Sequence, residues 1–320
     1  MNPINRREFV ERLGSLCGAA LVTGRAMALE ESASRALRRF KLGSISDEWS
    51  QDFEAALKGM KSYGLRWVEI RTLWDIYNTE TTPKQLGRLK DLLAKYEFEV
   101  SVLDTALYKC TLPGTQPVSS ENDPYPYSGQ TDLLKRAMER AHALSTNTLR
   151  VFAFWRVAKP IELFPRIAEE ISKAAEVAGR EGFRLVLENE SICNVATGAE
   201  QARMMQLVPA SNFGMNWDIG NGYWQGETSF PDGYALLPKK RIWHMHLKDV
   251  RCAPDYKDCN TAIVGTGQVK LLDQLRAMVR DGYDGTMSLE PEYEDQATSH
   301  LAATKRSLEA LLKVMATALA

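Results

Sequence analysis

Short apolar runs alternate with longer amphipathic segments along most of the chain. Runs of about five to eight residues rich in Val, Ile, Leu, Phe and Trp predict strands buried on both faces, and apolar residues spaced three to four apart predict helices. The predicted strands lie at residues 39–45, 67–72, 99–105, 148–155, 184–190, 213–219, 241–249 and 286–291. The predicted helices lie at residues 52–63, 83–96, 131–144, 161–182, 198–208, 271–280 and 298–318.

This alternation predicts an α/β fold with a parallel sheet. Eight strand–helix units within about 290 residues favour a (β/α)8 TIM barrel in a single domain. The rival is an open doubly wound sheet. No Gly-x-Gly-x-x-Gly follows the first strand and no Walker-type loop is present, so the sequence offers no support for a nucleotide-binding sheet.

The first residues follow a different pattern. Arg6 and Arg7 precede a weakly apolar segment at 13–24, which ends in the small-x-small motif at 26–28. This order is typical of an export signal, the paired arginines resemble a twin-arginine signal, and the segment is too short to span a bilayer. We therefore expect residues 1–28 to be a signal, residues 29–320 to be the barrel and the protein to be periplasmic. The alternative is an ordinary amphipathic helix on a cytoplasmic protein.

Composition narrows the function classes. Lys and Arg number 40 and Asp and Glu 41, a formal net charge of −1, so no basic excess exists to bind nucleic acid. Five cysteines are too few for a disulfide-built scaffold. Cys252 and Cys259 lie close together in the sequence, and export would allow them to pair, but the sequence does not decide whether they do.

The ionisable residues gather where the predicted strands end, which is where barrel enzymes carry their chemistry. In chain order they are Glu69, Glu188, Glu190, Asp218, His244, His246, Asp249, Glu290 and Glu292. A carboxylate at the end of an apolar strand is costly if it is buried without a partner. One such group alone is more often solvated, but the repetition over four consecutive strands indicates a binding site.

One ligand from each of four neighbouring strands is sufficient to surround a divalent cation. Mostly oxygen donors with one imidazole suit Mn²⁺, Co²⁺, Mg²⁺ or Zn²⁺. His244 and His246 point to the same face of their strand because side chains alternate. His246 lies nearer the mouth and is the better ligand, which leaves His244 to support it or to pack.

Five segments in order resemble the xylose isomerase-like barrel superfamily of sugar phosphate isomerases and epimerases, which includes D-tagatose 3-epimerase, hydroxypyruvate isomerase and inosose dehydratase. They are LVLENE at 185–190, WDIGN at 217–221, HMHLKD at 244–249, GTGQV at 265–269 and GYDGTMSLEPEY at 282–293. The resemblance implies metal ligation by Glu188, Asp218, His246 and Glu290. It also implies that Glu188 and Glu290 move protons.

The substrate side departs from that family. Asn221 stands where the sugar epimerases place a substrate-binding His, and Glu190 with Ser191 stands where relatives often carry a His. With four histidines in all, the chain also lacks the ligands for a metal cluster of the endonuclease IV type. The candidates for substrate contact are Glu69, Arg71, Trp155, Glu190, Asn221, His244 and Lys248.

These residues predict a metal-dependent sugar isomerase or epimerase that transfers a proton next to a carbonyl through a metal-stabilised enediolate. If a β-substituent leaves instead, the same site is a lyase or dehydratase acting on a keto sugar, cyclitol or glycoside. A sugar-binding barrel without catalysis is the third class. The expected partner is a small carbohydrate, and the sequence also allows a homo-oligomer.

Overall fold

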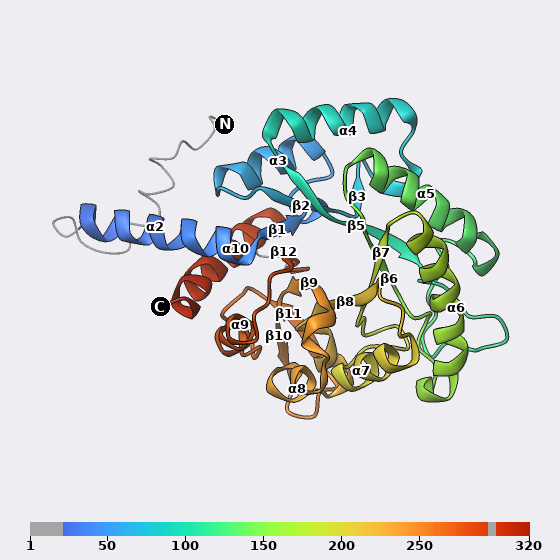
Figure 1. Cartoon of the computed structure of the whole chain (residues 1–320). Coiled ribbons are helices and arrows are strands. Elements are labelled where there is room, and N and C mark those ends of the chain that lie inside the picture. Colours follow the sequence, from blue (N-terminus) through green and yellow to red (C-terminus); the bar gives the residue numbers. More distant parts are fainter. Residues whose placement is uncertain (1–21, 294–298) are drawn as a thin grey trace.

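The computed structural model describes residues 22–293 and 299–320, and these residues form a closed barrel surrounded by helices (Figure 1). All eight barrel strands are parallel to their neighbours, and β1 pairs with both β2 and β12, which closes the sheet. The strands are β1 (Leu42–Ile45), β2 (Trp67–Ile70), β5 (Glu99–Leu107), β6 (Thr148–Val151), β7 (Arg184–Glu188), β8 (Phe213–Asp218), β9 (Ile242–Leu247) and β12 (Thr286–Leu289). The predicted (β/α)8 barrel is confirmed.

The helices form the outer layer around the strands (Figure 1). They are α2 (Val22–Phe40), α3 (Phe53–Ser62), α4 (Pro83–Tyr96), α5 (Gln130–Ala143), α6 (Pro160–Arg180), α7 (Gly198–Leu207), α8 (Tyr234–Leu236), α9 (Leu271–Arg280) and α10 (His300–Ala318). Local chemistry sets several boundaries: Thr82 and Gln85 form a capping box around Pro83, which stands at the first turn of α4. The predicted helix at residues 83–96 is confirmed with the same boundaries.

Six of the eight strand predictions extend too far at their C-terminal ends, by one to four residues. The predicted strand 148–155 ends at Val151, and the predicted strand 241–249 ends at Leu247. At the mouth the chain turns away from the sheet, and Phe154 adopts a positive φ of 60°. An apolar run continues through this turn because the residues beyond the strand are buried as well, so hydrophobicity alone does not mark where pairing stops.

Two short hairpins lie outside the barrel sheet, β3 (Thr72–Leu73) with β4 (Ile76–Tyr77) and β10 (Asp249–Cys252) with β11 (Cys259–Ala262). Cys252 and Cys259 form a disulfide across the second hairpin. The Asp249 carboxylate accepts backbone N–H bonds from Gly265, Gly267 and Val269 at 2.9–3.1 Å. A Cβ on Gly267 would stand 2.2 Å from Asp249 Oδ1. The GTGQV segment is therefore a loop anchored by Asp249.

The N-terminal helix α2 lies beside the C-terminal helix α10 (Figure 1). Ala36 and Phe40 of α2 are buried, and the Arg39 guanidinium donates to the Tyr283 carbonyl at 2.7 Å, so the end of α2 belongs to the barrel. The predicted cleavage motif at 26–28 falls inside α2, while the rest of the predicted signal, residues 1–21, lies outside the described residues. None of the helices in the described part of the chain combines the length and apolar character that a membrane crossing needs.

Candidate metal centre and active site

Four of the predicted ligands meet at the C-terminal mouth of the barrel. Glu188 ends β7, Asp218 ends β8, His246 lies in β9 and Glu290 directly follows β12. The strand register brings them together, because Asp218 pairs with His246 across β8 and β9. Each residue offers one ligand atom, all four atoms lie within 4.8 Å of one another, and all four residues are buried.

The imidazole of His246 faces the three carboxylates through Nδ1. This nitrogen lies 2.8 Å from Glu290 Oε2, 3.2 Å from Glu188 Oε1 and 3.8 Å from Asp218 Oδ2. Asp218 Oδ2 and Glu290 Oε2 are buried and, within the described residues, accept no hydrogen bond of ordinary geometry, although Lys248 Nζ lies 3.1 Å from each. Buried carboxylate oxygens that converge on one point and exceed the neighbouring positive charges suit a cation, so these four residues fit a divalent metal ion with oxygen and nitrogen ligands.

The charges in this cluster shift one another's pKa values. Burial raises the pKa of Asp218 to about 7, with Lys248 opposing the shift and Glu290 adding to it. Burial would lower the pKa of His246, but the carboxylates of Glu290, Glu69 and Glu188 raise it well above its ordinary value. The metal-free site therefore holds protons near neutral pH, and a cation must displace them.

An arginine holds the outer oxygen of each of two glutamates. Arg150 of β6 lies 2.9 Å from Glu188 Oε2 and 3.0 Å from Asp104 Oδ2. Arg71, which follows β2, lies 2.7 Å from Glu290 Oε1. Burial opposes ionisation of both glutamates, but the neighbouring cations outweigh it: the pKa of Glu188 is lowered and that of Glu290 is held well below its ordinary value.

The predicted substrate residue Lys248 is almost fully buried, and its ammonium reaches three carboxylates. It lies 3.1 Å from Asp218 and Glu290 and 2.7 Å from Glu292 Oε2. Asn221 Oδ1 lies 3.5 Å from the same ammonium. Lys248 and Asn221 thus border the four-ligand cluster.

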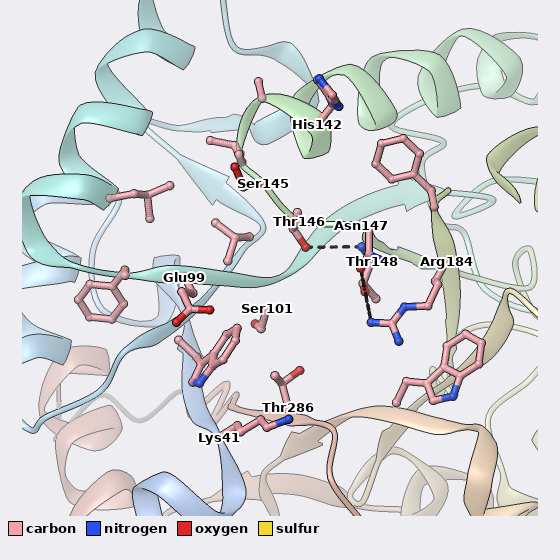
Figure 2. Close-up of a pocket in the computed structure, with 18 of the residues that line it drawn as sticks. Lys41, Glu99, Ser101, His142, Ser145, Thr146, Asn147, Thr148, Arg184 and Thr286 are labelled. Carbon is pink, nitrogen blue, oxygen red and sulfur yellow. Dashed lines mark hydrogen bonds between the residues drawn. The ribbon is translucent and has the colours of Figure 1, made fainter. Parts of the chain in front are cut away.

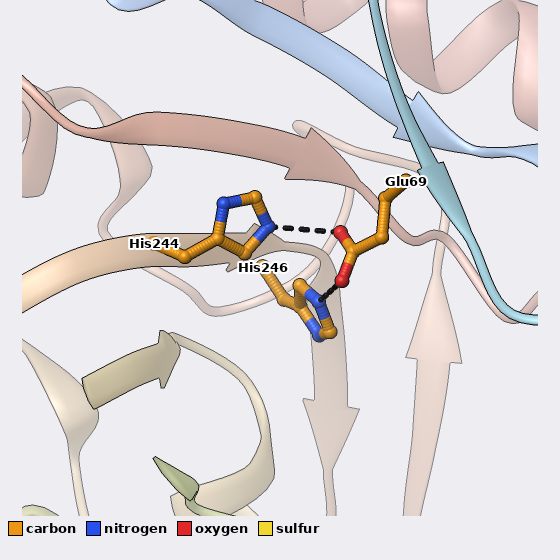
Figure 3. A group of neighbouring side chains, drawn as sticks. All are labelled: Glu69, His244 and His246. Atoms are coloured by element: carbon orange, nitrogen blue, oxygen red, sulfur yellow. Dashed lines mark hydrogen bonds and ion pairs between the residues drawn. The ribbon is translucent and has the colours of Figure 1, made fainter. Parts of the chain in front are cut away.

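Glu69 and His244, also predicted substrate residues, lie under His246 and have no exposed surface (Figure 3). Glu69 accepts from His244 Nε2 at 2.8 Å and from His246 Nε2 at 3.0 Å. The ligand atoms of Glu69, His244 and His246 also lie within 4.8 Å of one another. Their direct contact is with His246.

Glu190 and Trp155 sit to one side, at the ends of β7 and β6. Glu190 forms an ion pair of 3.3 Å with Lys109 and keeps a partly exposed side chain. Trp155 is 3% exposed and its indole N–H donates to Asp123 Oδ1 at 2.7 Å, which ties down the loop that follows β5.

Several charged residues of the site were not predicted from the sequence. They are Asp47 and Glu48, which follow β1 and pair with Arg71 at 2.9 Å, Asp104 of β5 and Arg150 of β6. A charged residue inside an apolar run, as in TLRVF and EVSVLDT, was a usable signal for the last two, because such a group must point into a polar interior. Glu292, although noted at a strand end, pairs with Lys248 and has a positive φ of 44°.

A cavity of about 1030 Å³ lies at the opposite end of the barrel (Figure 2). Its lining includes Trp67, Glu99, Thr148, Arg184 and Thr286, each of which begins a barrel strand. The N-terminal face of such barrels contributes stability, whereas chemistry occurs at the C-terminal face. We therefore assign the candidate active site to the four-ligand cluster and not to this cavity.

Fold and site together define a single (β/α)8 barrel whose C-terminal mouth carries three carboxylates and a histidine. The xylose isomerase-like TIM barrel family matches residues 57–314, and the chain belongs to this family. The predicted family is thereby confirmed.

Solved structures with this fold are similar at low sequence identity. The IolI protein with a bound zinc atom has a TM-score of 0.69 and 17% identity, covering 86% of this chain and 98% of that one. L-ribulose 3-epimerase has a TM-score of 0.64 and 17% identity, covering 87% and 95%. A xylose isomerase-like TIM barrel protein from Mycobacterium smegmatis in complex with magnesium has a TM-score of 0.61 and 14% identity, covering 84% and 89%. No match was found among curated protein sequences.

Proposed function

We propose that this protein is a divalent-metal-dependent isomerase or epimerase that acts on a small carbohydrate by proton transfer next to a carbonyl. One observation carries the proposal: four buried ligand atoms from Glu188, Asp218, His246 and Glu290 converge within 4.8 Å at the barrel mouth. These four residues would hold the cation. When bound, a divalent cation supplies a Lewis acid that polarises a carbonyl and favours loss of the neighbouring proton.

The two glutamates supply the acid–base chemistry in this proposal. Arg150 and Arg71 favour the ionised form of Glu188 and Glu290, so either carboxylate is able to accept a proton. In each turnover one glutamate starts as the carboxylate and the other as the protonated acid. The first takes a proton from the carbon next to the carbonyl and leaves an enediolate; the second gives its proton to the opposite face of that carbon, which yields the epimer and exchanges the protonation states of the two glutamates. If the first glutamate instead gives its proton to the former carbonyl carbon, and the proton of the neighbouring hydroxyl passes to the former carbonyl oxygen, the product is the aldose–ketose isomer.

The remaining polar groups at the mouth orient the substrate. Lys248 and Arg71 lie 3.1 and 2.7 Å from Glu290, and they are placed to donate to substrate oxygens. Glu292, whose side chain is 41% exposed and reaches both cations, is the acidic group placed to accept from a hydroxyl. The L-ribulose 3-epimerase likeness supports the reaction class through the shared fold.

Solvent exchange tests the reaction class. The protein, reconstituted with Mn²⁺, is incubated with free ketoses and 3-keto sugars in D₂O, and products are read by mass spectrometry and NMR. We expect deuterium at the carbon next to the carbonyl and no other change in mass, with the rate lowered about 10²- to 10⁴-fold in Glu290→Gln. Products that have lost water or an aglycone would identify the alternative lyase, and absence of exchange with every substrate would overturn the proposal.

We also propose that residues 1–28 direct export to the periplasm through a twin-arginine pathway. The test is fractionation of cells that express the full chain, followed by N-terminal sequencing of the envelope form. A mature form that begins near residue 29 supports the proposal. A protein confined to the cytoplasm and beginning at Met1 contradicts it.

A further inference from the structure

Glu69 lies between His244 and His246, a proposed metal ligand, and joins the two imidazoles in one line of hydrogen bonds (Figure 3). Its two oxygens are divided between two imidazoles: Oε2 lies 2.8 Å from His244 Nε2, and Oε1 lies 3.0 Å from His246 Nε2. All three side chains are fully buried, so no water competes for these contacts. A carboxylate in this position accepts two N–H donors, one on each oxygen.

At the other end of this line of hydrogen bonds, the second ring nitrogen of His244 also has a partner. His244 Nδ1 lies 2.7 Å from the hydroxyl of Thr286, a residue that lines the cavity at the N-terminal face (Figure 2). With the Nε2–H of His244 donated to Glu69, Nδ1 of the same ring is placed to accept the hydroxyl hydrogen of Thr286. The hydroxyl can also rotate to accept, so Thr286 tolerates either tautomer of His244.

His246 lacks this freedom. Its Nδ1 faces Glu188, Asp218 and Glu290, and a nitrogen that binds a cation must present a lone pair there. Its proton must then sit on Nε2, which faces Glu69. The Asn216 side chain also lies 2.9 Å from this Nε2 through its Nδ2. With the amide turned by 180°, its Oδ1 shares the Nε2 proton with Glu69, and its NH₂ group takes the position that has no partner.

We propose that Glu69 is a positioning residue that holds His246 in the Nε2–H tautomer and so directs the Nδ1 lone pair into the metal site, with His244 and Thr286 orienting Glu69 from below. This inference rests on the metal site of the proposed function, but it concerns metal binding and requires no turnover. A carboxylate that orients a ligand histidine contributes about 10- to 100-fold to metal affinity.

A second cation between Glu69, His244 and His246 is the competing interpretation, since their ligand atoms also lie within 4.8 Å. The contacts of 2.8 and 3.0 Å are of ordinary hydrogen-bond length, and Thr286 satisfies the remaining nitrogen of His244. These bonds are complete without an ion. We therefore expect one zinc ion per chain.

Replacement of Glu69 by Gln keeps the shape and changes the hydrogen-bond pattern. The amide presents one oxygen and one NH₂ group, so only one of the two imidazoles retains an acceptor. We expect His244 to be the residue that loses this acceptor, because it can move its proton to Nδ1 and donate to the Thr286 hydroxyl. The neutral amide oxygen is a weaker acceptor for the His246 Nε2–H than a carboxylate, so His246 Nδ1 becomes a less basic and less firmly oriented ligand. We therefore expect Glu69→Gln to bind zinc about 10- to 100-fold more weakly, measured by chelator competition. The matched control is Glu200→Gln, a buried glutamate paired with Arg156 outside the site, which should bind zinc within about twofold of wild type.

The tautomers can be read directly with ¹⁵N-histidine, since the chain has four histidines. In the zinc-loaded wild type we expect the proton on Nε2 of both His244 and His246, a measurement that needs no variant. In Glu69→Gln we expect His244 to change to the Nδ1–H tautomer while His246 keeps its proton on Nε2.

These measurements test the metal site and the positioning role of Glu69 separately. If the wild type binds no zinc, both the metal site and this inference fail. If the wild type binds zinc at Nδ1 of His246 but Glu69→Gln binds it as tightly, the metal site stands and the role of Glu69 is overturned. A proton on Nδ1 of His246 in the loaded protein, or a second zinc bound to His244, overturns the inference as well.

Discussion

Arg150 is the cation whose removal tests the buried charge network most directly. It is 4% exposed and lies 2.9 Å from Glu188 and 3.0 Å from Asp104. In Arg150→Met the stem of the side chain remains and its charge is lost, so both carboxylates lose their buried partner. Breaking a buried ion pair from one side costs about 3–5 kcal/mol, because the remaining charge has neither water nor a counter-charge.

The structure places the expected loss at the lower end of that range. Burial raises the pKa of Asp104 well above its ordinary value, with Arg150 opposing the shift and Glu69 adding to it. Without Arg150 the pKa of Asp104 rises further, so Asp104 is neutral, and Glu188 keeps His246, 3.2 Å away, as its remaining cationic neighbour. We expect a loss of about 3 kcal/mol in the free energy of unfolding, which lowers the Tm by roughly 6 °C in a domain of this size.

Urea titration and thermal melts of the metal-free protein, prepared with a chelator, measure this loss. The control is Arg180→Met on the exposed side of α6, whose pair with Glu176 has both side chains more than 60% exposed; an exposed pair of this kind contributes about 0–1 kcal/mol. If Arg150→Met loses less than about 1 kcal/mol, like an exposed pair, the ion pairs under Glu188 do not exist as described and the reasoning fails.

Three further predictions concern pH and the disulfide. Apparent metal affinity should rise from pH 6 to 8, measured by titration calorimetry, because the cation displaces protons from Asp218, with a pKa of about 7, and from His246, whose pKa is raised; an affinity independent of pH would contradict this. The hydrogen bond to Glu48 raises the pKa of His300 above 6.5, so the pair stabilises the fold fully below pH 6.5 and loses that effect as the pH rises through the raised value. His300→Gln should therefore lower the Tm at pH 6 and much less at pH 9. The loss at pH 6 should correspond to at most about 1 kcal/mol, because the pair is half-exposed. Cys252→Ala should have a free energy of unfolding about 2 kcal/mol below that of the oxidised wild type. Against wild type whose disulfide has been reduced, the variant should show no such difference.

The fold could be predicted from the sequence because each strand–helix unit is locally consistent. Apolar runs and helical periodicity are properties of single segments, so the strand at 99–105 and the helix at 271–280 needed no knowledge of their partners. The hairpin of β10 and β11 escaped prediction because its residues, DVRC and CNTA, are short and mostly polar. What holds this hairpin is the disulfide and the bonds that Asp249 makes to a later loop, and neither is visible in local periodicity.

The four proposed ligands could be predicted because the ends of consecutive parallel strands meet at one mouth of a barrel. The residues beneath them could not, since their roles depend on register across the barrel. Glu69 and His244 are 175 residues apart, and Arg150 and Glu188 are 38 apart. Glu69 was expected to face substrate because it ends a strand; the structure shows its contacts are with two histidines.

The near-neutral charge of the whole chain conceals an imbalance at the mouth. Among the described residues, one connected set of ion pairs contains eight carboxyl groups and three Arg or Lys side chains: Asp47, Glu48, Glu69, Asp104, Glu188, Asp218, Glu290 and Glu292 with Arg71, Arg150 and Lys248. Protonation of Asp104, Asp218 and His246 offsets part of the excess, and the protons on Asp218 and His246 block ligand atoms. A divalent cation neutralises the same excess and leaves Nδ1 of His246 and the carboxylate oxygens as ligands. The surplus of buried acids at the mouth is thus itself a physical argument for metal binding there.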